Sequence, residues 1–144
     1  MIRLPLLAPD TPEKFPDPAL ALVEPNGLLA FGGDLSPTRL LTAYKLGIFP
    51  WFSKGEPILW WSPDPRCVFR TDALQPNRSL RRQLAGKRWR VTVDLAFEAV
   101  IHGCAAPRDK HSGTWLVPDM IDAYVQLHRQ GYAHSVETWD ENRV

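Results

Sequence analysis

The sequence predicts an α+β fold, in which a small proline-rich N-terminal domain precedes a domain of alternating strands and helices. Two observations indicate this arrangement. Eleven of the 14 prolines precede Arg66, and prolines at that density favour turns and short elements. After Arg66 the apolar residues recur with the period of strands and then of helices. We therefore expect domains at residues 1–65 and 66–144.

The N-terminal domain is expected to contain a capped helix over residues 36–46. The Ser36 hydroxyl can accept a hydrogen bond from a free N–H group of the first turn, and Pro37 suits the first helical position. Gly47 follows as a residue that readily adopts the left-handed conformation found at helix ends. These signals together fix both ends of the helix.

Aromatic residues are concentrated in and after this helix, at Tyr44, Phe49, Trp51, Phe52, Trp60 and Trp61. Aromatic side chains usually pack in a core, and spacing alone favours that interpretation here. The alternative is a stacking platform for nucleobases or for a large apolar side chain. The sequence by itself leaves both interpretations open.

The remaining elements are expected in this order: an extended arm at 1–23, short strands at 58–61 and 67–69, a helix at 77–86, a strand at 89–93, helices after Asp94 and from Pro118, and a strand at 132–139. Asp94 is a candidate N-cap for its helix. Pro118 suits the first turn of the last helix. A turn is expected at 140–142, and because only two residues follow it, we expect the sequence to be cut off within a strand pair.

The most informative charge feature lies between Ala73 and Val93, where six basic residues occur without an acidic one. Three of the basic residues fall within one turn of the predicted helix: Arg78, Arg81 and Arg82. A charge run of this kind is commonly a solvated helix face. The absence of acids equally favours an electropositive patch directed at phosphates.

Composition limits the other possible partners. The net charge is +1, so any affinity for nucleic acid has to come from a local patch. The two cysteines form no metal-binding pair or disulfide framework, which suits a reducing compartment, and His102 with Cys104 supplies too few ligands for zinc. No signal peptide or membrane-spanning run is present. We expect a cytoplasmic protein without a bound metal, and nothing predicts an oligomer.

Seven short runs carry a resemblance to a known family. Three lie between Glu24 and Arg66: EPNGLLAFGGDLSPTRLL, AYKLGIFPWF and PILWWSPDPR. Four follow in order along the chain: NRSLRR, GTW, DAYVQLH and GYAHSVE. Together these runs resemble the bacterial leucyl/phenylalanyl-tRNA–protein transferases over almost the whole chain.

The resemblance implies an enzyme that transfers Leu or Phe from aminoacyl-tRNA to the N-terminal Arg or Lys of proteins, which marks them for N-end rule degradation. It also implies an acetyltransferase-like (GNAT-type) second domain and no metal or organic cofactor. The family's aromatic residues around the aminoacyl-adenosine end match Tyr44, Trp51, Trp115 and Tyr124. Its basic tRNA-binding helix matches Asn77–Arg82, so the resemblance assigns tRNA contacts to Arg78, Arg81 and Arg82.

The chain departs from the family in length. Complete members are longer, and the resemblance places their Asp and Gln relay, the Glu that receives the basic N-terminus and the Leu/Phe pocket beyond Val144. No catalytic residue is therefore assigned, and we expect the C-terminally truncated chain to be inactive alone. Two alternatives stay open: a non-catalytic tRNA- or RNA-binding module, and a chain that folds only on a partner supplying the missing strands.

Overall fold

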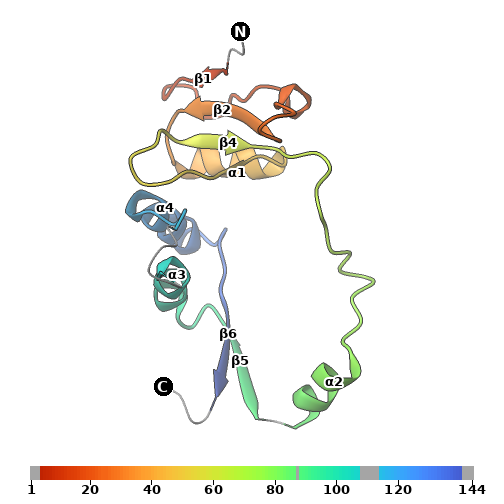
Figure 1. Cartoon of the computed structure of the whole chain (residues 1–144). Coiled ribbons are helices and arrows are strands. Elements are labelled where there is room, and N and C mark those ends of the chain that lie inside the picture. Colours follow the sequence, from red (N-terminus) through yellow and green to blue (C-terminus); the bar gives the residue numbers. More distant parts are fainter. Residues whose placement is uncertain (1–3, 87, 108–113, 141–144) are drawn as a thin grey trace.

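The computed structural model describes residues 4–86, 88–107 and 114–140. It confirms the α+β class, because these residues form four α-helices and two small sheets. Figure 1 shows a small sheet with one covering helix at the N-terminal end, two helices in the middle and a two-stranded sheet at the other end.

The N-terminal sheet has the strand order β1-β2-β4-β3, with bounds β1 Leu6–Leu7, β2 Leu28–Gly32, β3 Phe49–Pro50 and β4 Leu59–Trp61. β1 runs parallel to β2, whereas β4 runs antiparallel to both β2 and β3. The expected N-terminal arm contains β1 and a short 3-10 helix, η1 (Pro18–Leu20). Successive strand residues point to opposite faces. Trp60 is accordingly fully buried, whereas Trp61 remains half-buried on the other face.

Helix α1 (Pro37–Lys45) follows β2 and confirms the predicted capped helix. The Ser36 hydroxyl accepts a hydrogen bond from the Arg39 backbone N–H at 3.4 Å, and Pro37 occupies the first turn. Gly47 adopts a φ of +75° just after the helix. Local capping signals therefore predicted both helix ends.

A buried arginine in α1 has no counterpart in the sequence-based expectations. Arg39 is fully buried, and its guanidinium donates to the Asp34 carboxylate at 3.3 Å and to the Ala8 carbonyl at 2.6 Å. It also lies 5.8 Å from the centroid of the Phe15 ring. The side chain thus joins α1 to the N-terminal arm and to the turn before the helix.

The second half of the chain contains α2 (Arg78–Ala85), β5 (Trp89–Val93), α3 (Phe97–Ala105), α4 (Pro118–Arg129) and β6 (Val136–Asp140). β5 and β6 pair antiparallel, with Val93 opposite Val136. The register places Trp89, Val91 and Val93 on one face of this pair, as the alternation predicted.

Three expectations for this half are wrong. Residues 67–69 form no strand, because Val68 and Phe69 are exposed and gain no burial that would stabilise one. Asp94 does not cap α3, whose N-cap residue Ala96 has no side-chain cap bond. Instead Asp94 adopts a φ of 58° and accepts a hydrogen bond from the Ser135 N–H. The last strand begins at Val136 rather than at residue 132. The turn expected at 140–142 lies outside the described residues except for Asp140, which belongs to β6.

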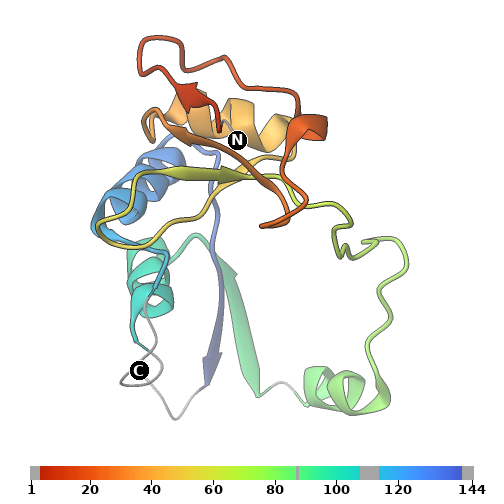
Figure 2. The same cartoon turned by 45° about the horizontal axis from the view of Figure 1, so that its top comes forward.

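Helix α4 connects the two hydrophobic clusters of the molecule. Its residues Ala123 and Leu127 pack with the N-terminal sheet and α1. Met120, on the same helix, packs instead with Phe97, Ile101 and other residues of the second cluster. Figures 1 and 2 both show α4 between α1 and α3, and both show the chain after β4 running as an arc to α2. No residue of α2 is buried.

Candidate functional site

The structure brings together the four aromatic residues that the resemblance assigned to substrate binding. We call Tyr44, Trp51, Trp115 and Tyr124 the aromatic site. The Tyr44 and Tyr124 hydroxyl groups form a hydrogen bond between α1 and α4. The Trp115 and Tyr124 rings meet edge to face, with centroids 6.3 Å apart. Trp51 and Trp115 line one cavity of about 240 Å³. Residues from two distant stretches of the chain, 44–51 and 115–124, thus lie next to one another.

Exposure distinguishes this site from ordinary core aromatics. Trp51 is 56% exposed and Trp115 is 39% exposed. By contrast, Trp60 is fully buried, and its indole N–H donates to the Gly32 carbonyl at 3.0 Å. The aromatic cluster of the N-terminal part therefore divides: Trp60 and Phe52 belong to the core, whereas Trp51 presents its ring to solvent. Core packing is confirmed for Trp60 and Phe52, whereas exposed Trp51 remains available for the predicted stacking.

The two tyrosines of the site are neutral near pH 7. Burial raises the pKa of the Tyr44 phenol and that of the Tyr124 phenol above the ordinary value of 10.0. Neither phenol can therefore act as a general base at neutral pH. Their hydroxyl groups instead join α1 to α4 through the hydrogen bond between them.

A second hollow, of about 260 Å³, also borders Trp115, together with Tyr124, and is lined largely by residues of α3. His134 and Ser135 contribute its polar lining. The His134 Nδ1–H donates to the Asp94 carboxylate at 2.7 Å. This hydrogen bond raises the pKa of the His134 imidazole and lowers that of the Asp94 carboxyl. The hollow therefore combines an apolar wall with an imidazole held by a carboxylate.

A buried carboxylate supports this polar edge. Glu137 in β6 is 6% exposed, and it accepts hydrogen bonds from the Ser135 and Thr92 hydroxyls at 2.5 Å each. It also accepts from the Ala96 N–H at 3.2 Å. These bonds to the ionised form lower the pKa of Glu137. Sequence reasoning missed the roles of Asp94, His134 and Glu137, although the GYAHSVE run contains two of the three.

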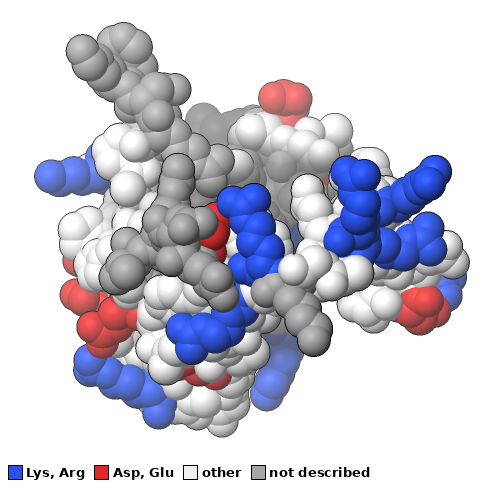
Figure 3. All heavy atoms as spheres, turned by 90° about the horizontal axis from the view of Figure 1, so that it is seen from below, with Lys and Arg blue, Asp and Glu red and all other residues white. Residues whose placement is uncertain are grey.

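The basic residues of α2 lie apart from the aromatic site. Arg78, Arg81 and Arg82 occupy a helix without a buried residue, at the end of the arc that leaves β4. Figure 3 shows Lys and Arg side chains gathered on the side of the molecule where α2 lies. Of the other basic residues, Arg88 pairs with Asp140 at 2.8 Å, and Lys87 lies outside the described residues. The structure thus supports an electropositive surface on α2 but does not place it against the aromatic site.

The histidines and cysteines offer no metal centre within the described ranges, where no group of three or more His, Cys, Asp or Glu residues is placed to hold an ion. Cys67 and Cys104 are free and exposed. His128 is a packed histidine: its ring stacks on Phe97 with centroids 4.0 Å apart, and its Nδ1–H donates to the Ala133 carbonyl at 2.8 Å. None of the described helices is long and apolar enough to cross a membrane.

Comparison with known proteins identifies the class of protein that carries these elements. Residues 68–144 match the family described as leucyl/phenylalanyl-tRNA protein transferase, and residues 33–64 match the N-terminal domain of the same family. The chain belongs to the leucyl/phenylalanyl-tRNA–protein transferase family. The resemblance inferred from the seven sequence runs is thereby confirmed.

Individual relatives are similar over most of this chain but are longer. A leucyl/phenylalanyl-tRNA–protein transferase of Shewanella sediminis is 57% identical over 132 residues, which cover 92% of this chain and 56% of the relative. Relatives of the same name from Enterobacter sp. and Pseudomonas fluorescens are 59% and 57% identical over 130 residues, or 55% and 58% of their lengths. The chain spans little more than half the length of these relatives.

Proposed function

We propose that this chain forms the aminoacyl-nucleotide-binding part of an enzyme that transfers Leu or Phe from aminoacyl-tRNA to the N-terminal Arg or Lys of proteins. The observation that carries the proposal is the aromatic site, in which Trp51 and Trp115 present exposed rings to one cavity. Stacking of a nucleobase on an aromatic ring contributes about 1–3 kcal/mol per base. The site therefore suits the terminal adenosine of a charged tRNA.

The chemistry of the proposed reaction separates binding from proton transfer. An α-amino group has a pKa of about 7.7–8.0, so only a minor fraction is the nucleophilic free base at neutral pH. Attack on the aminoacyl ester also needs an acceptor for the amine proton and donors for the tetrahedral oxyanion. The aromatic site orients the adenosine, which lowers the entropic cost of the reaction, but its indoles and neutral phenols accept no proton.

The proposed enzyme follows the remaining expectations for its family. We infer a two-domain protein divided near Arg66, with an acetyltransferase-like second domain, no metal or organic cofactor and a cytoplasmic location. Arg78, Arg81 and Arg82 are the proposed contacts to the tRNA backbone, because α2 exposes three cations within one turn. The relay that moves the amine proton is expected in the part of the relatives that this chain does not cover.

Binding of charged tRNA and transfer of its amino acid test the proposal together. We expect the chain to bind Phe-tRNA, and Trp51→Ala to weaken that binding about 5- to 150-fold, the equivalent of one stacked base. Trp89→Ala is the matched control, because Trp89 is exposed like Trp115 but lies on β5, away from the site.

We expect no transfer of labelled Phe from Phe-tRNA to a peptide with N-terminal Arg. Transfer above background would contradict the inferred need for the missing relay.

A non-catalytic RNA-binding module is the second candidate, favoured by the basic run that includes α2. In that case Arg78→Ala with Arg82→Ala would weaken binding to any RNA and make its salt dependence shallower, by about one unit of slope for each phosphate that the protein no longer neutralises. Trp51→Ala would then leave the affinity for charged tRNA unchanged. That result would refute the proposed aminoacyl-nucleotide site and retain the module.

A further inference from the structure

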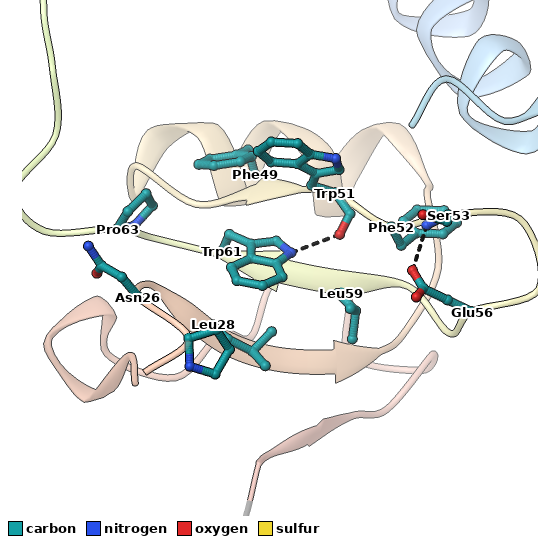
Figure 4. Close-up of a pocket in the computed structure, with 11 residues that line it drawn as sticks. Asn26, Leu28, Phe49, Trp51, Phe52, Ser53, Glu56, Leu59, Trp61 and Pro63 are labelled. Atoms are coloured by element: carbon teal, nitrogen blue, oxygen red, sulfur yellow. Dashed lines mark hydrogen bonds between the residues drawn. The ribbon is translucent and has the colours of Figure 1, made fainter. Parts of the chain in front are cut away.

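The outer face of the N-terminal sheet carries a larger hollow than the two that flank Trp115. Its volume is about 520 Å³. Figure 4 shows Trp61 at its centre, with Phe49 and Trp51 along one side and Leu28 and Leu59 along the other. The strand register explains this arrangement, since Trp61 pairs with Phe49 on one neighbouring strand and with Leu28 on the other.

This hollow is continuous with the aromatic site through shared residues. Phe49 and Trp51 line both the 520 Å³ hollow and the 240 Å³ cavity that Trp115 closes. The Trp61 indole N–H donates to the Trp51 carbonyl at 2.7 Å, which fixes the two tryptophans relative to each other. A polymeric ligand with one unit stacked on Trp51 would therefore place its next unit, if of similar width, at Trp61.

Of the described residues that line the hollow, only Glu56 is charged, but a cation beside the lining favours a nucleotide as that unit. The Arg66 guanidinium lies 4.8 Å from the centroid of the Phe49 ring and donates to the Gly47 carbonyl at 3.0 Å. This contact holds a cation beside the aromatic lining. The hollow's lining ends at Pro63, where the chain departs along the arc towards the cations of α2. Flat apolar faces in the lining thus lie next to positive charge outside it, and proteins bind single-stranded nucleic acid through this combination.

We propose that this hollow binds the unpaired nucleotide that precedes the terminal aminoacyl-adenosine, with its base stacked on Trp61. The proposal rests on the proposed function, because it extends the same ligand by one residue from the aromatic site. Every tRNA ends in unpaired C-C-A, so the nucleotide is a cytidine. Glu56 lies at the end of the hollow away from Pro63 (Figure 4). Its carboxylate accepts a hydrogen bond from the Ser53 N–H at 2.7 Å.

Two probes test the proposal by calorimetry. The first is 3′-phenylalanylamino-3′-deoxyadenosine, in which an amide replaces the labile ester. The second carries an additional 5′-linked cytidine. We expect the second probe to bind about 5- to 150-fold more tightly than the first, the equivalent of one further stack. Trp61→Ala should abolish this gain, which is measured as the ratio of the two affinities within the variant, because loss of the Trp61–Trp51 hydrogen bond also affects the first probe. Arg66→Gln, a change outside the sheet, should reduce the gain without altering the first probe's affinity.

The outcomes separate this inference from the proposed function. Equal affinity for the two probes would overturn the nucleotide subsite and leave the aminoacyl-adenosine site in place. Failure of both probes to bind would overturn both. A gain that survives Trp61→Ala and Arg66→Gln would place the cytidine elsewhere and refute this hollow. Competition of the second probe alone by a peptide with N-terminal Arg would assign the hollow to the protein substrate instead.

Discussion

Asp34 and Arg39 form the most consequential charged pair of the N-terminal half. The arginine is fully buried, and the Asp34 carboxylate is its charge partner at 3.3 Å. A buried charge that loses its partner is strongly destabilising, because the desolvation cost remains while the attraction disappears. This pair therefore stabilises the turn from which α1 and the aromatic site follow.

We predict that Asp34→Asn lowers the free energy of unfolding by about 3 kcal/mol. This value is at the lower end of the range for breaking a buried ion pair, because Asp34 is itself partly exposed. Denaturation by urea measures the change. Asp72→Asn is the matched control, since Asp72 pairs with Arg70 at 2.7 Å on the surface. The control should show no measurable loss, and an equal loss in both variants would contradict this role for Arg39.

The Tyr44–Tyr124 hydrogen bond provides a second test at single residues. Each hydroxyl is the other's partner across α1 and α4, so Tyr44→Phe and Tyr124→Phe should each cost about 0.5–1.5 kcal/mol of unfolding free energy. The double variant should cost no more than the larger single loss, because the second change removes a hydroxyl that has already lost its partner. Strict additivity in the thermal or urea unfolding of the three variants would mean that the hydroxyls do not interact.

At the scale of elements, the Asp94–His134 pair fixes the segment between α4 and β6 to the end of β5. His134 Nδ1–H and the Ser135 N–H both donate to the Asp94 carboxylate. His128 Nδ1 lies 3.8 Å from the same carboxylate. Asp94 and His134 are both ionised only at pH values between the pKa of the Asp94 carboxyl and the pKa of the His134 imidazole. The contribution of the pair to stability must therefore depend on pH.

The sign of that dependence follows from the two shifts. The pKa of His134 is raised above 6.5, so its contribution is complete below 6.5 and is lost as pH rises through the raised value. The pKa of Asp94 is lowered below 3.8, so its contribution is present above 3.8 and is lost as pH falls through the lowered value. We predict that His134→Asn reduces the melting temperature most between pH 3.8 and 6.5, where both partners are ionised, and least once the pH exceeds the raised pKa of His134. His102→Asn, on the exposed face of α3, is the control and should show no such trend.

Local signals predicted the elements well and their partners poorly. The ends of α1 followed from Ser36, Pro37 and Gly47, since capping depends on residues within one turn. The partner of Asp94 could not be predicted in this way. It lies some forty positions away in sequence, and nothing local distinguishes an N-cap aspartate from one that binds a distant strand. The expected strand at 67–69 failed for the same reason, because burial depends on what packs against it.

The candidate site likewise could be predicted only in part from the sequence. The resemblance selected Tyr44, Trp51, Trp115 and Tyr124, and the structure places them together. Spacing alone could not separate exposed Trp51 from buried Trp60, because their difference depends on which sheet face α1 covers. The hollow around Trp61 was not predicted, since it depends on the register of three strands.

Across the whole molecule, α4 holds the two hydrophobic clusters together, while the arc and α2 remain exposed. The β5–β6 pair presents Trp89, Val91 and Val93 to solvent on one face. Its other face carries the buried Glu137 network against α3. The aromatic site lies where α4 meets the N-terminal sheet, so buried residues of both elements support the proposed ligand contacts.

The indole N–H signals of the six tryptophans provide the most direct test of that site. We would titrate the chain with 3′-phenylalanylamino-3′-deoxyadenosine and follow each indole by NMR, with Trp→Phe variants to assign the signals. We predict that the Trp51 and Trp115 signals shift, whereas those of buried Trp60 and distant Trp89 stay in place. Shifts at Trp89 with Trp51 and Trp115 unchanged would contradict an aminoacyl-adenosine site at the junction of α4 and the N-terminal sheet.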